Sequence, residues 1–252
     1  MRRIKIEVAY DGSNYCGWQI QPDKPTVEGT LDRVLSDVLK EEIKVAGASR
    51  TDAGVHALGN VAIFDTDTPI PAERIFLAVN PHLPDDIKIV KSEEVSDDFH
   101  PRFQDSLKTY EYHIQTGPAP LPVYARNCHW VPGKPDLDAM REAGQILVGR
   151  HDFKSFCAAG AQVKTTVRTI KSLELSEREI SPGFNEIIIT VTGEGFLYNM
   201  VRIIAGTLLK AGYHAWPPGY VEEIIRGQDR RLAGETAPAK GLILKKITYR
   251  SA

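Results

Sequence analysis

The chain has 252 residues, of which 42% are hydrophobic and 25% are charged, so it can bury a sizeable core as one large domain or two small ones. Its 31 Lys and Arg against 33 Asp and Glu give a net charge of −2, and it contains 20 Gly and 16 Pro. These values exclude a collagen-like chain, a strongly charged disordered chain and a uniformly basic nucleic-acid coat.

The first 105 residues predict the element order β-α-β-β-α-β. Alternating apolar and polar residues indicate a strand over 4–9, and apolar residues at helical spacing indicate a helix over 27–39 with Thr26 as its N-cap. This order is the split arrangement of ferredoxin-like and RNA-recognition domains. The other expected elements are strands over 43–48, 59–65 and 87–95 and a helix over 71–79.

Residues 106–252 predict a second α+β half, so we expect domains at 1–105 and 106–252. Its expected elements are strands over 107–115, 167–175, 186–192 and 242–249 and helices over 136–148, 198–210 and 218–225. The fold class is therefore α+β, with two pseudosymmetric halves, mixed and mostly antiparallel sheets, helices on one side and a cleft between the halves. The first 105 residues hold 12 Lys and Arg against 19 Asp and Glu, a net charge of −7, and the remainder holds 19 against 14, a net charge of +5. The second half is thus expected to supply much of the attraction for an anionic partner, in a basic cleft.

Cysteine usage and the N-terminus bear on the compartment. Cys16, Cys128 and Cys157 form no C-x-x-C pair, so neither a disulfide framework nor a thiolate zinc cluster is expected, which suits a reducing cytosol. Residues 1–12 resemble a strand rather than a signal peptide, and the apolar residues 200–209 are too few to span a membrane. We expect a cytoplasmic protein without a membrane segment.

Several common catalytic motifs are missing from the sequence. The seven His residues form no H-E-x-x-H pattern and no close His/Cys/carboxylate cluster, and neither a Walker loop nor G-x-S-x-G is present. Gly193 and Gly195 begin a G-x-G-x-x-G pattern whose third glycine is missing. Metal, serine-hydrolase and dinucleotide sites are therefore not expected.

Residues 47–59 place Arg50, Asp52 and three glycines between two expected strands. Asp52 has two interpretations: a turn residue that bonds nearby amides, or a carboxylate that a rigid scaffold presents to a ligand. Arg202 lies among apolar residues of an expected helix, where an unpaired charge would be costly. It either extends outward to solvent or meets a carboxylate, for which Asp52 is an attractive candidate.

Strand alternation over residues 107–115 sends Lys108, Tyr110, Tyr112 and Ile114 to one face. Two tyrosines on such a face are usually core residues. An aromatic side chain beside a lysine can also stack on an unpaired base, as strand aromatics do in RNA-binding domains.

Several ordered motifs occur together along nearly the whole chain. They are Tyr10-Asp11-Gly12 with Gly17-Trp18-Gln19, residues 47–56, Asp98-Phe99-His100 with Arg102-Phe103, Tyr110-x-Tyr112, Asp152-Phe153 with Ser155-Phe156, Met200-Val201-Arg202 and Gly241-Leu242. In this order and spacing the chain resembles the tRNA pseudouridine synthases of the TruA family.

The resemblance implies a role for each candidate residue: Asp52 as the catalytic aspartate, Tyr110 as the tyrosine against the target base, and Arg202 as the basic partner of the aspartate. It further implies that Arg50 lies beside the displaced base and that Leu242 belongs to the hydrophobic wall of the pocket. It also implies isomerisation of uridines 38, 39 and 40 in the anticodon stem-loop of tRNA without cofactor or metal. Members of the family are homodimers in which one tRNA contacts both subunits.

Two other functions fit parts of the sequence. A non-enzymatic RNA-binding protein built from two RNA-recognition-like halves would explain the strand aromatics and the basic half, but it does not require Asp52 opposite a buried Arg202. A nucleoside hydrolase would use an aspartate, but the paired carboxylates that serve as acid and base are not apparent.

Overall fold

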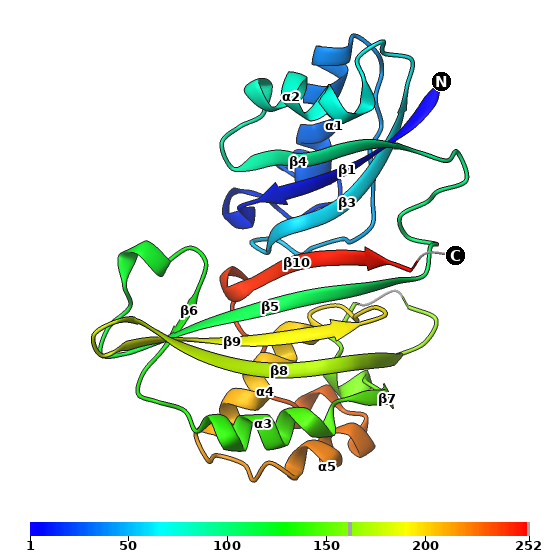
Figure 1. Ribbon diagram of the computed structural model, residues 1–252. Coiled ribbons are helices and arrows are strands. Elements are labelled where there is room, and N and C mark those ends of the chain that lie inside the picture. Colours follow the sequence, from blue (N-terminus) through cyan, green and yellow to red (C-terminus); the bar gives the residue numbers. More distant parts are fainter. Residues whose placement is uncertain (161–162, 251–252) are drawn as a thin grey trace. The chain divides into compact units, whose positions relative to one another are not determined.

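The computed structural model describes residues 1–160 and 163–250, which form two compact units (Figure 1). The first unit contains Met1–Ser106 together with residues 244–250, and the second contains Leu107–Ile243. Each unit is built around a group of neighbouring β-strands.

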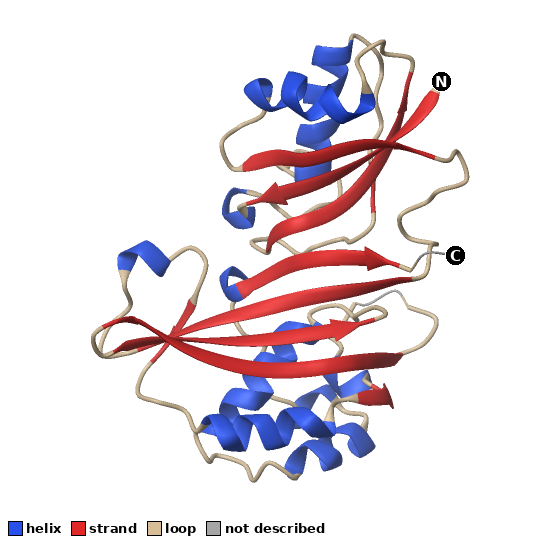
Figure 2. Ribbon diagram, viewed as in Figure 1, coloured by secondary structure: helices blue, strands red, loops and turns tan. Residues whose placement is uncertain are grey.

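The sheet of the first unit is centred on β1 (Arg2–Tyr10), which lies antiparallel between β4 (Ile87–Val95) and β3 (His56–Thr66). β2 (Ala46–Gly47) and β10 (Leu242–Tyr249) continue the sheet beyond β3. α1 (Val27–Leu39) and α2 (Ile75–Val79) pack on one face of the sheet (Figure 2). The inward side chains of β1 alternate along the strand and are fully buried, as in Ile4, Ile6 and Val8.

The expected β-α-β-β-α-β order of the first unit is confirmed, with one strand much shorter than predicted. α1 begins where predicted, because the Thr26 hydroxyl accepts a hydrogen bond from the Gly29 N–H at 3.3 Å. The prediction of a strand over 43–48 was wrong for its first residues, because β2 begins only at Ala46. The Ser36 hydroxyl accepts from the Ile43 N–H at 2.9 Å and an Asp32 oxygen accepts from the Val45 N–H at 2.8 Å, so side chains of α1 replace ladder bonds there.

The sheet of the second unit has the order β5-β9-β8-β7, and all three pairings are antiparallel. β6 (His129–Val131) lies parallel to the end of β5. The other strands are β5 (Ser106–Thr116), β7 (Gly149–Asp152), β8 (Val167–Ser181) and β9 (Phe184–Gly193). α3 (Leu137–Ile146), α4 (Met200–Gly212) and α5 (Tyr220–Gly227) lie together on one side of this sheet (Figure 2).

The predicted α+β class with mostly antiparallel sheets is confirmed. In the second half the predicted strands and helices are present with ends within two residues of those predicted, except that β8 continues to Ser181 instead of ending at 175. The short strands β6 and β7 were not predicted. Along the chain, β5, α3, β8, β9 and α4 repeat the β-α-β-β-α order of the first unit. The described residues also form short 3-10 helices at Gly12–Asn14, Ala72–Arg74, Asn80–His82, Pro122–Tyr124, Lys154–Phe156, Arg230–Leu232 and Ala239–Gly241.

Within residues 1–160 and 163–250, no helix has the length and apolar character needed to cross a membrane.

Candidate functional site

The polar segment singled out in the sequence is the connection between β2 and β3 in the first unit. The Ala48 N–H still donates to the Val61 carbonyl of β3 at 2.7 Å, and the connection leaves the sheet at the next residue. In this connection Arg50 is exposed, Asp52 is half-buried and Thr51 is buried with 7% of its surface exposed. The backbone carbonyl of Asp52 accepts from the Val55 N–H at 3.1 Å and closes the turn. The Asp52 carboxylate is therefore presented from a loop whose turn is made by the backbone.

The 3-10 helix and loop that follow β1 brace the Asp52 loop. The Trp18 N–H donates to the Thr51 carbonyl at 3.0 Å, and the Gly54 N–H donates to the Tyr15 carbonyl at 3.3 Å. Gly17 has a φ of +94°, and a Cβ there would lie 2.7 Å from the Thr51 carbonyl oxygen. Only glycine permits both this backbone conformation and this close approach. The glycine in the Gly17-Trp18 motif thus has a direct structural role in holding the Asp52 loop.

The other candidate residues lie in the second unit. Tyr110 on β5 is 8% exposed, and its ring meets that of Phe196 edge-on with centroids 5.3 Å apart. Arg202 on α4 is half-buried; its Nε donates to the Ala237 carbonyl and a terminal nitrogen donates to Asn199 Oδ1, both at 2.7 Å. The guanidinium is therefore held in place by neutral acceptors within its own unit.

Leu242 is also buried, with 6% exposure, at the start of β10. It follows Gly241, where a Cβ would lie 2.7 Å from Cζ of the Tyr112 ring. The Tyr112 hydroxyl donates to the Pro238 carbonyl at 2.9 Å. This contact explains why the Gly241-Leu242 motif needs a glycine, since a side chain there would displace the Tyr112 ring.

The described structure thus groups the candidates by unit. Arg50 and Asp52 share one loop of the first unit, whereas Tyr110, Arg202 and Leu242 belong to the second. The pairing of Asp52 with Arg202 stays a prediction.

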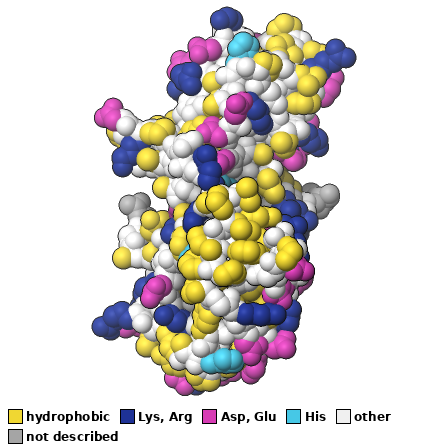
Figure 3. Space-filling view, turned by 90° about the vertical axis from the view of Figure 1, so that its left-hand side faces the viewer, with side chains coloured by type: hydrophobic (Ala, Val, Ile, Leu, Met, Phe, Trp, Pro, Cys, Tyr) yellow, Lys and Arg dark blue, Asp and Glu magenta, His cyan; other side chains and the backbone are white. Residues whose placement is uncertain are grey.

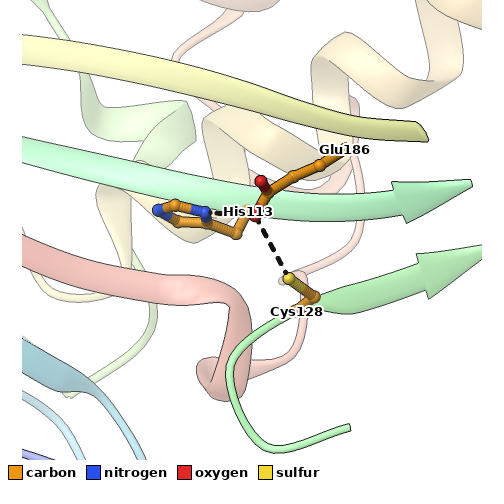
Figure 4. A group of neighbouring side chains, drawn as sticks. All are labelled: His113, Cys128 and Glu186. Carbon is orange, nitrogen blue, oxygen red and sulfur yellow. Dashed lines mark hydrogen bonds and ion pairs between the residues drawn. The ribbon is translucent and has the colours of Figure 1, made fainter. Parts of the chain in front are cut away.

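Among the described residues, the fold assembles a His/Cys/carboxylate cluster that the sequence did not indicate (Figure 4). His113 on β5, Glu186 on β9 and Cys128 just before β6 have ligand atoms that all lie within 4.8 Å of one another. These residue types suit a transition metal. Their atoms are already paired, because Glu186 Oε1 lies 2.8 Å from His113 Nδ1 and accepts from the Cys128 thiol at 3.5 Å.

Arg178 completes this cluster as an ion pair. Its Nε donates to Glu186 Oε2 at 2.6 Å, so both carboxylate oxygens are already hydrogen-bonded. The positive charge of the guanidinium also disfavours binding of a metal cation at this carboxylate. The hydrogen bond with His113 is the main cause that lowers the pKa of Glu186 to about 2, and Arg178 adds to it against the opposing effect of burial. Burial raises the pKa of Cys128 to about 12, and Glu186 adds to that shift. We interpret the cluster as an ion pair between the buried Glu186 and the exposed Arg178 that stabilises the sheet.

Sequence reasoning missed the buried polar residues that contact the Asp52 loop from the sheet, chief among them Asn60, which is fully buried on β3. The available signal was an asparagine inside a strand of apolar residues, where a buried amide needs hydrogen-bond partners.

Comparison with known proteins gives consistent results along the whole chain. A family model described as "tRNA pseudouridine synthase" matches residues 6–104 and 143–250. The protein named tRNA pseudouridine synthase A from Ruminiclostridium cellulolyticum is 46% identical over 252 residues, which cover 99% of this chain and all of that protein. Proteins of the same name from Clostridium acetobutylicum and Brevibacillus brevis are each 43% identical over 249 residues, with 99% and 100% of the two chains covered.

Among solved structures, a chain of an archaeal box H/ACA sRNP Nop10-Cbf5 complex aligns with a TM-score of 0.36 and 12% identity over 82% of this chain and 44% of that chain. A score this low carries no argument about function.

Proposed function

This chain belongs to the tRNA pseudouridine synthase family, and on that premise we propose that Asp52 is the residue that drives its reaction. The protein isomerises uridine to pseudouridine in tRNA: the bond between uracil N1 and the sugar C1′ breaks, the base rotates, C5 bonds to C1′ and loses its proton, and N1 takes up a proton. The observation that carries the proposal is a carboxylate on a loop that close backbone contacts hold in place. A carboxylate that reacts with a bound substrate must be held in a fixed position relative to that substrate.

The target nucleotide must leave the helical stack before the reaction, which costs a few kcal/mol. We assign Tyr110 to stack against the extruded uracil, which recovers about 1–3 kcal/mol. The edge-on contact with Phe196 fixes the plane of the Tyr110 ring and supports this assignment. Arg50, exposed on the Asp52 loop, is assigned to the space beside the displaced base, and Leu242 to the hydrophobic wall of the pocket.

Arg202 is the proposed basic partner of Asp52. A guanidinium already oriented by Ala237 and Asn199 loses little conformational entropy when it pairs with a carboxylate. The pair would keep the carboxylate ionised and directed at the nucleoside. Two chemical routes are open to Asp52: attack on C1′ to give a covalent intermediate, or removal of a sugar proton to give a glycal. Tyr110 is the candidate that assists loss of the C5 proton.

The proposed substrate site is the anticodon stem-loop, at positions 38, 39 and 40. We assign the catalytic aspartate to the domain of residues 1–105 and base stacking and much of the phosphate attraction to residues 106–252, whose net charge follows from 19 Lys and Arg against 14 Asp and Glu. The enzyme is proposed to work in the cytoplasm and to need no cofactor or metal.

The enzyme is further proposed to be a homodimer in which one tRNA contacts both subunits. An apolar loop between β5 and β6, residues 117–125, supports an assembly of this kind, since it exposes Val123 at 82% of its surface together with several prolines. Figure 3 shows hydrophobic side chains gathered on the face of the second unit that contains this loop. The loop is held in one shape by Gln115, whose side chain bonds the Ala119 carbonyl at 3.1 Å and the Leu121 N–H at 3.0 Å.

The experiment that tests the proposal uses unmodified tRNA with tritium at uridine C5. Purified protein is incubated with this tRNA without metal or nucleotide, released tritium is counted and the product is mapped. Release with pseudouridine at positions 38 to 40 is expected from the wild type. Asp52→Asn is expected to release none while binding tRNA within a few-fold of the wild type, because an amide has the shape of the carboxylate and lacks its charge.

Two results would contradict the proposal. Turnover by Asp52→Asn would remove the aspartate from the chemistry. Tight tRNA binding without any tritium release, from several tRNAs, would favour the RNA-binding module. Arg202→Leu serves as a second variant: normal turnover there would show that Arg202 is not the partner of Asp52.

A further inference from the structure

The side chain of Asn60 continues the β2–β3 ladder by one residue. The ladder pairs Ala46 with Ile63 and Gly47 with Ala62, and Ala48 still donates to β3. At Ser49 the backbone bonds to a side chain instead: its N–H donates to Asn60 Oδ1 at 3.3 Å and its carbonyl accepts from Asn60 Nδ2 at 3.0 Å. Asn60 is fully buried, so both bonds form away from water. The amide thus fixes the point from which the Asp52 loop departs.

The same amide nitrogen extends the network toward Asp52. Asn60 Nδ2 also donates to the Tyr10 hydroxyl at 3.3 Å, and that hydroxyl lies 2.7 Å from the Thr51 hydroxyl. Tyr10 and Thr51 are both buried, with 5% and 7% exposure. The Tyr10 hydroxyl therefore links the strand β3 to the residue immediately before Asp52.

Tyr10 is itself a rigid anchor. It ends β1, opposite Ala57 in the β1–β3 ladder, and its ring packs on that of Trp18 with centroids 5.9 Å apart. The backbone N–H of Trp18 in turn donates to the Thr51 carbonyl. Thr51 is consequently held at two points, its carbonyl by Trp18 and its side chain by Tyr10.

We propose that Tyr10 is a positioning residue for Asp52 that acts through its hydrogen bond to Thr51. The inference rests on the proposed role of Asp52 in the reaction. Fixing the side chain and carbonyl of Thr51 leaves the next residue little freedom to turn its carboxylate away from the substrate. The network is built from an amide and two hydroxyls, so it positions the carboxylate without adding a charge beside it. A displacement of 1 Å at a reacting group can cost about 100-fold in rate, which makes such an anchor worthwhile.

Tyr10→Phe tests the proposal, because it removes the hydroxyl and keeps the ring that packs on Trp18. We expect kcat to fall by about 10- to 100-fold while KM and the dissociation constant for tRNA stay within a few-fold. Tyr249→Phe is the matched control. The Tyr249 hydroxyl also donates to a neighbour in the first unit, the Pro101 carbonyl at 3.0 Å, so this variant loses a comparable bond and should keep its kcat.

A double-mutant cycle with Thr51→Val identifies the contact itself. If Tyr10 acts through Thr51, the double variant should be about as slow as each single variant, whereas independent effects would multiply. Thr51→Ser, which keeps the hydroxyl, should recover most of the rate. A Tyr10→Phe enzyme with normal kcat, or losses that multiply, would overturn the proposal.

Asp52→Asn is measured in parallel, so that the two possible failures can be told apart. An active Asp52→Asn enzyme would overturn the proposed role of Asp52. An inactive Asp52→Asn enzyme beside a Tyr10→Phe enzyme of normal kcat would overturn the positioning role alone.

Discussion

Each unit of this protein contains a network of linked polar side chains with a buried centre, and the two networks are built on different principles. The first unit links Asn60, Tyr10 and Thr51 with neutral hydrogen bonds. The second joins the Glu186 carboxylate to the Arg178 guanidinium and to the His113 ring. The neutral cluster bonds the backbone of a loop that leaves the sheet, whereas the ionic cluster joins side chains of neighbouring strands.

The strongly lowered pKa of Glu186 does not by itself mark a functional site. Glu186 has a pKa lowered to about 2, and every contact on its carboxylate is explained by a structural ion pair. The cluster that holds the Asp52 loop consists of an amide and two hydroxyl groups. Structural ion pairs perturb pKa values as active sites do, so the more informative feature is what a buried network holds in place.

Replacing Asn60 with Ala should have the largest effect on stability. The Ser49 N–H and carbonyl would lose their partners in a fully buried position, and the Tyr10 hydroxyl would lose a donor. At about 1–3 kcal/mol for each unsatisfied group, we expect the free energy of unfolding to fall by about 4 kcal/mol. Urea unfolding measures this loss, and the tritium assay should show a lower kcat in the folded variant.

Asn80 offers a matched control for this variant. Its amide bridges the backbone of Ile89 in the same two-way manner, with both distances 2.9 Å, but it is half-buried. Asn80→Ala should lose less stability, because water can replace the lost bonds, and kcat should not change. An equal loss of kcat in both variants would show that Asn60 contributes only general stability.

Replacing Glu186 with Gln should give a smaller loss that depends on pH. The folded pKa of Glu186 is depressed from 4.5 to about 2, so its ionised form stabilises the fold above pH 4.5, and this contribution is lost as the pH falls toward 2. We expect the variant to be less stable than the wild type by about 2 kcal/mol at pH 7. The difference should vanish near pH 2.

Unfolding measured at several pH values checks this expectation, and kcat at pH 7 should be unchanged. A stability difference that is the same at every pH would show that the lost interaction is packing rather than charge. The same measurement on Asn60→Ala should give a loss independent of pH, since the groups involved do not titrate in this range.

The elements of the fold followed from local pattern, and the polar clusters did not. The strands β1, β4 and β10 and the helix α1 have clear periods of two and 3.6 residues, and each lies within two residues of its predicted ends. β2 is shorter than predicted because Ser36 and Asp32 bond the backbone N–H groups of Ile43 and Val45. These side chains compete with a neighbouring strand for the backbone N–H groups. The competition depends on where α1 lies in the fold, and the periodicity of the sequence gives no information on that.

Part of the candidate site was likewise predictable from local sequence, and part depends on the tertiary fold. The loop that contains Asp52 was evident from its glycines and polar residues. The contact of Asn60 with Ser49 was not, because it depends on the register of β2 against β3. His113 and Glu186 are 73 residues apart and meet only because β5 pairs with β9. Pairing partners of strands are set by the whole fold, so a local pattern could mark Asn60 as a buried polar residue but could not show which residues either cluster brings together.

The smallest effect is expected at Cys128, the thiol of the ionic cluster. Burial is the main cause that raises its pKa to about 12, and the charge of Glu186 adds to it. Because the thiolate is the reactive form, iodoacetamide at pH 8 should modify the half-buried Cys16 while Cys128 stays unmodified in the native protein. Mass spectrometry of the digested protein measures both sites.

The Glu186→Gln variant then separates the two causes of this low reactivity. Removing the carboxylate charge should accelerate modification of Cys128 only slightly, since the thiol remains 2% exposed and burial is the larger cause. Modification as fast as that of Cys16 would mean that the ion pair of Glu186 with Arg178 keeps β6 paired with β5, so that charge protects the thiol by holding the structure together. The ionic cluster would then hold a segment of backbone in place, as the neutral cluster does. The remaining difference between the two clusters would be that only the stability from the ionic cluster depends on pH.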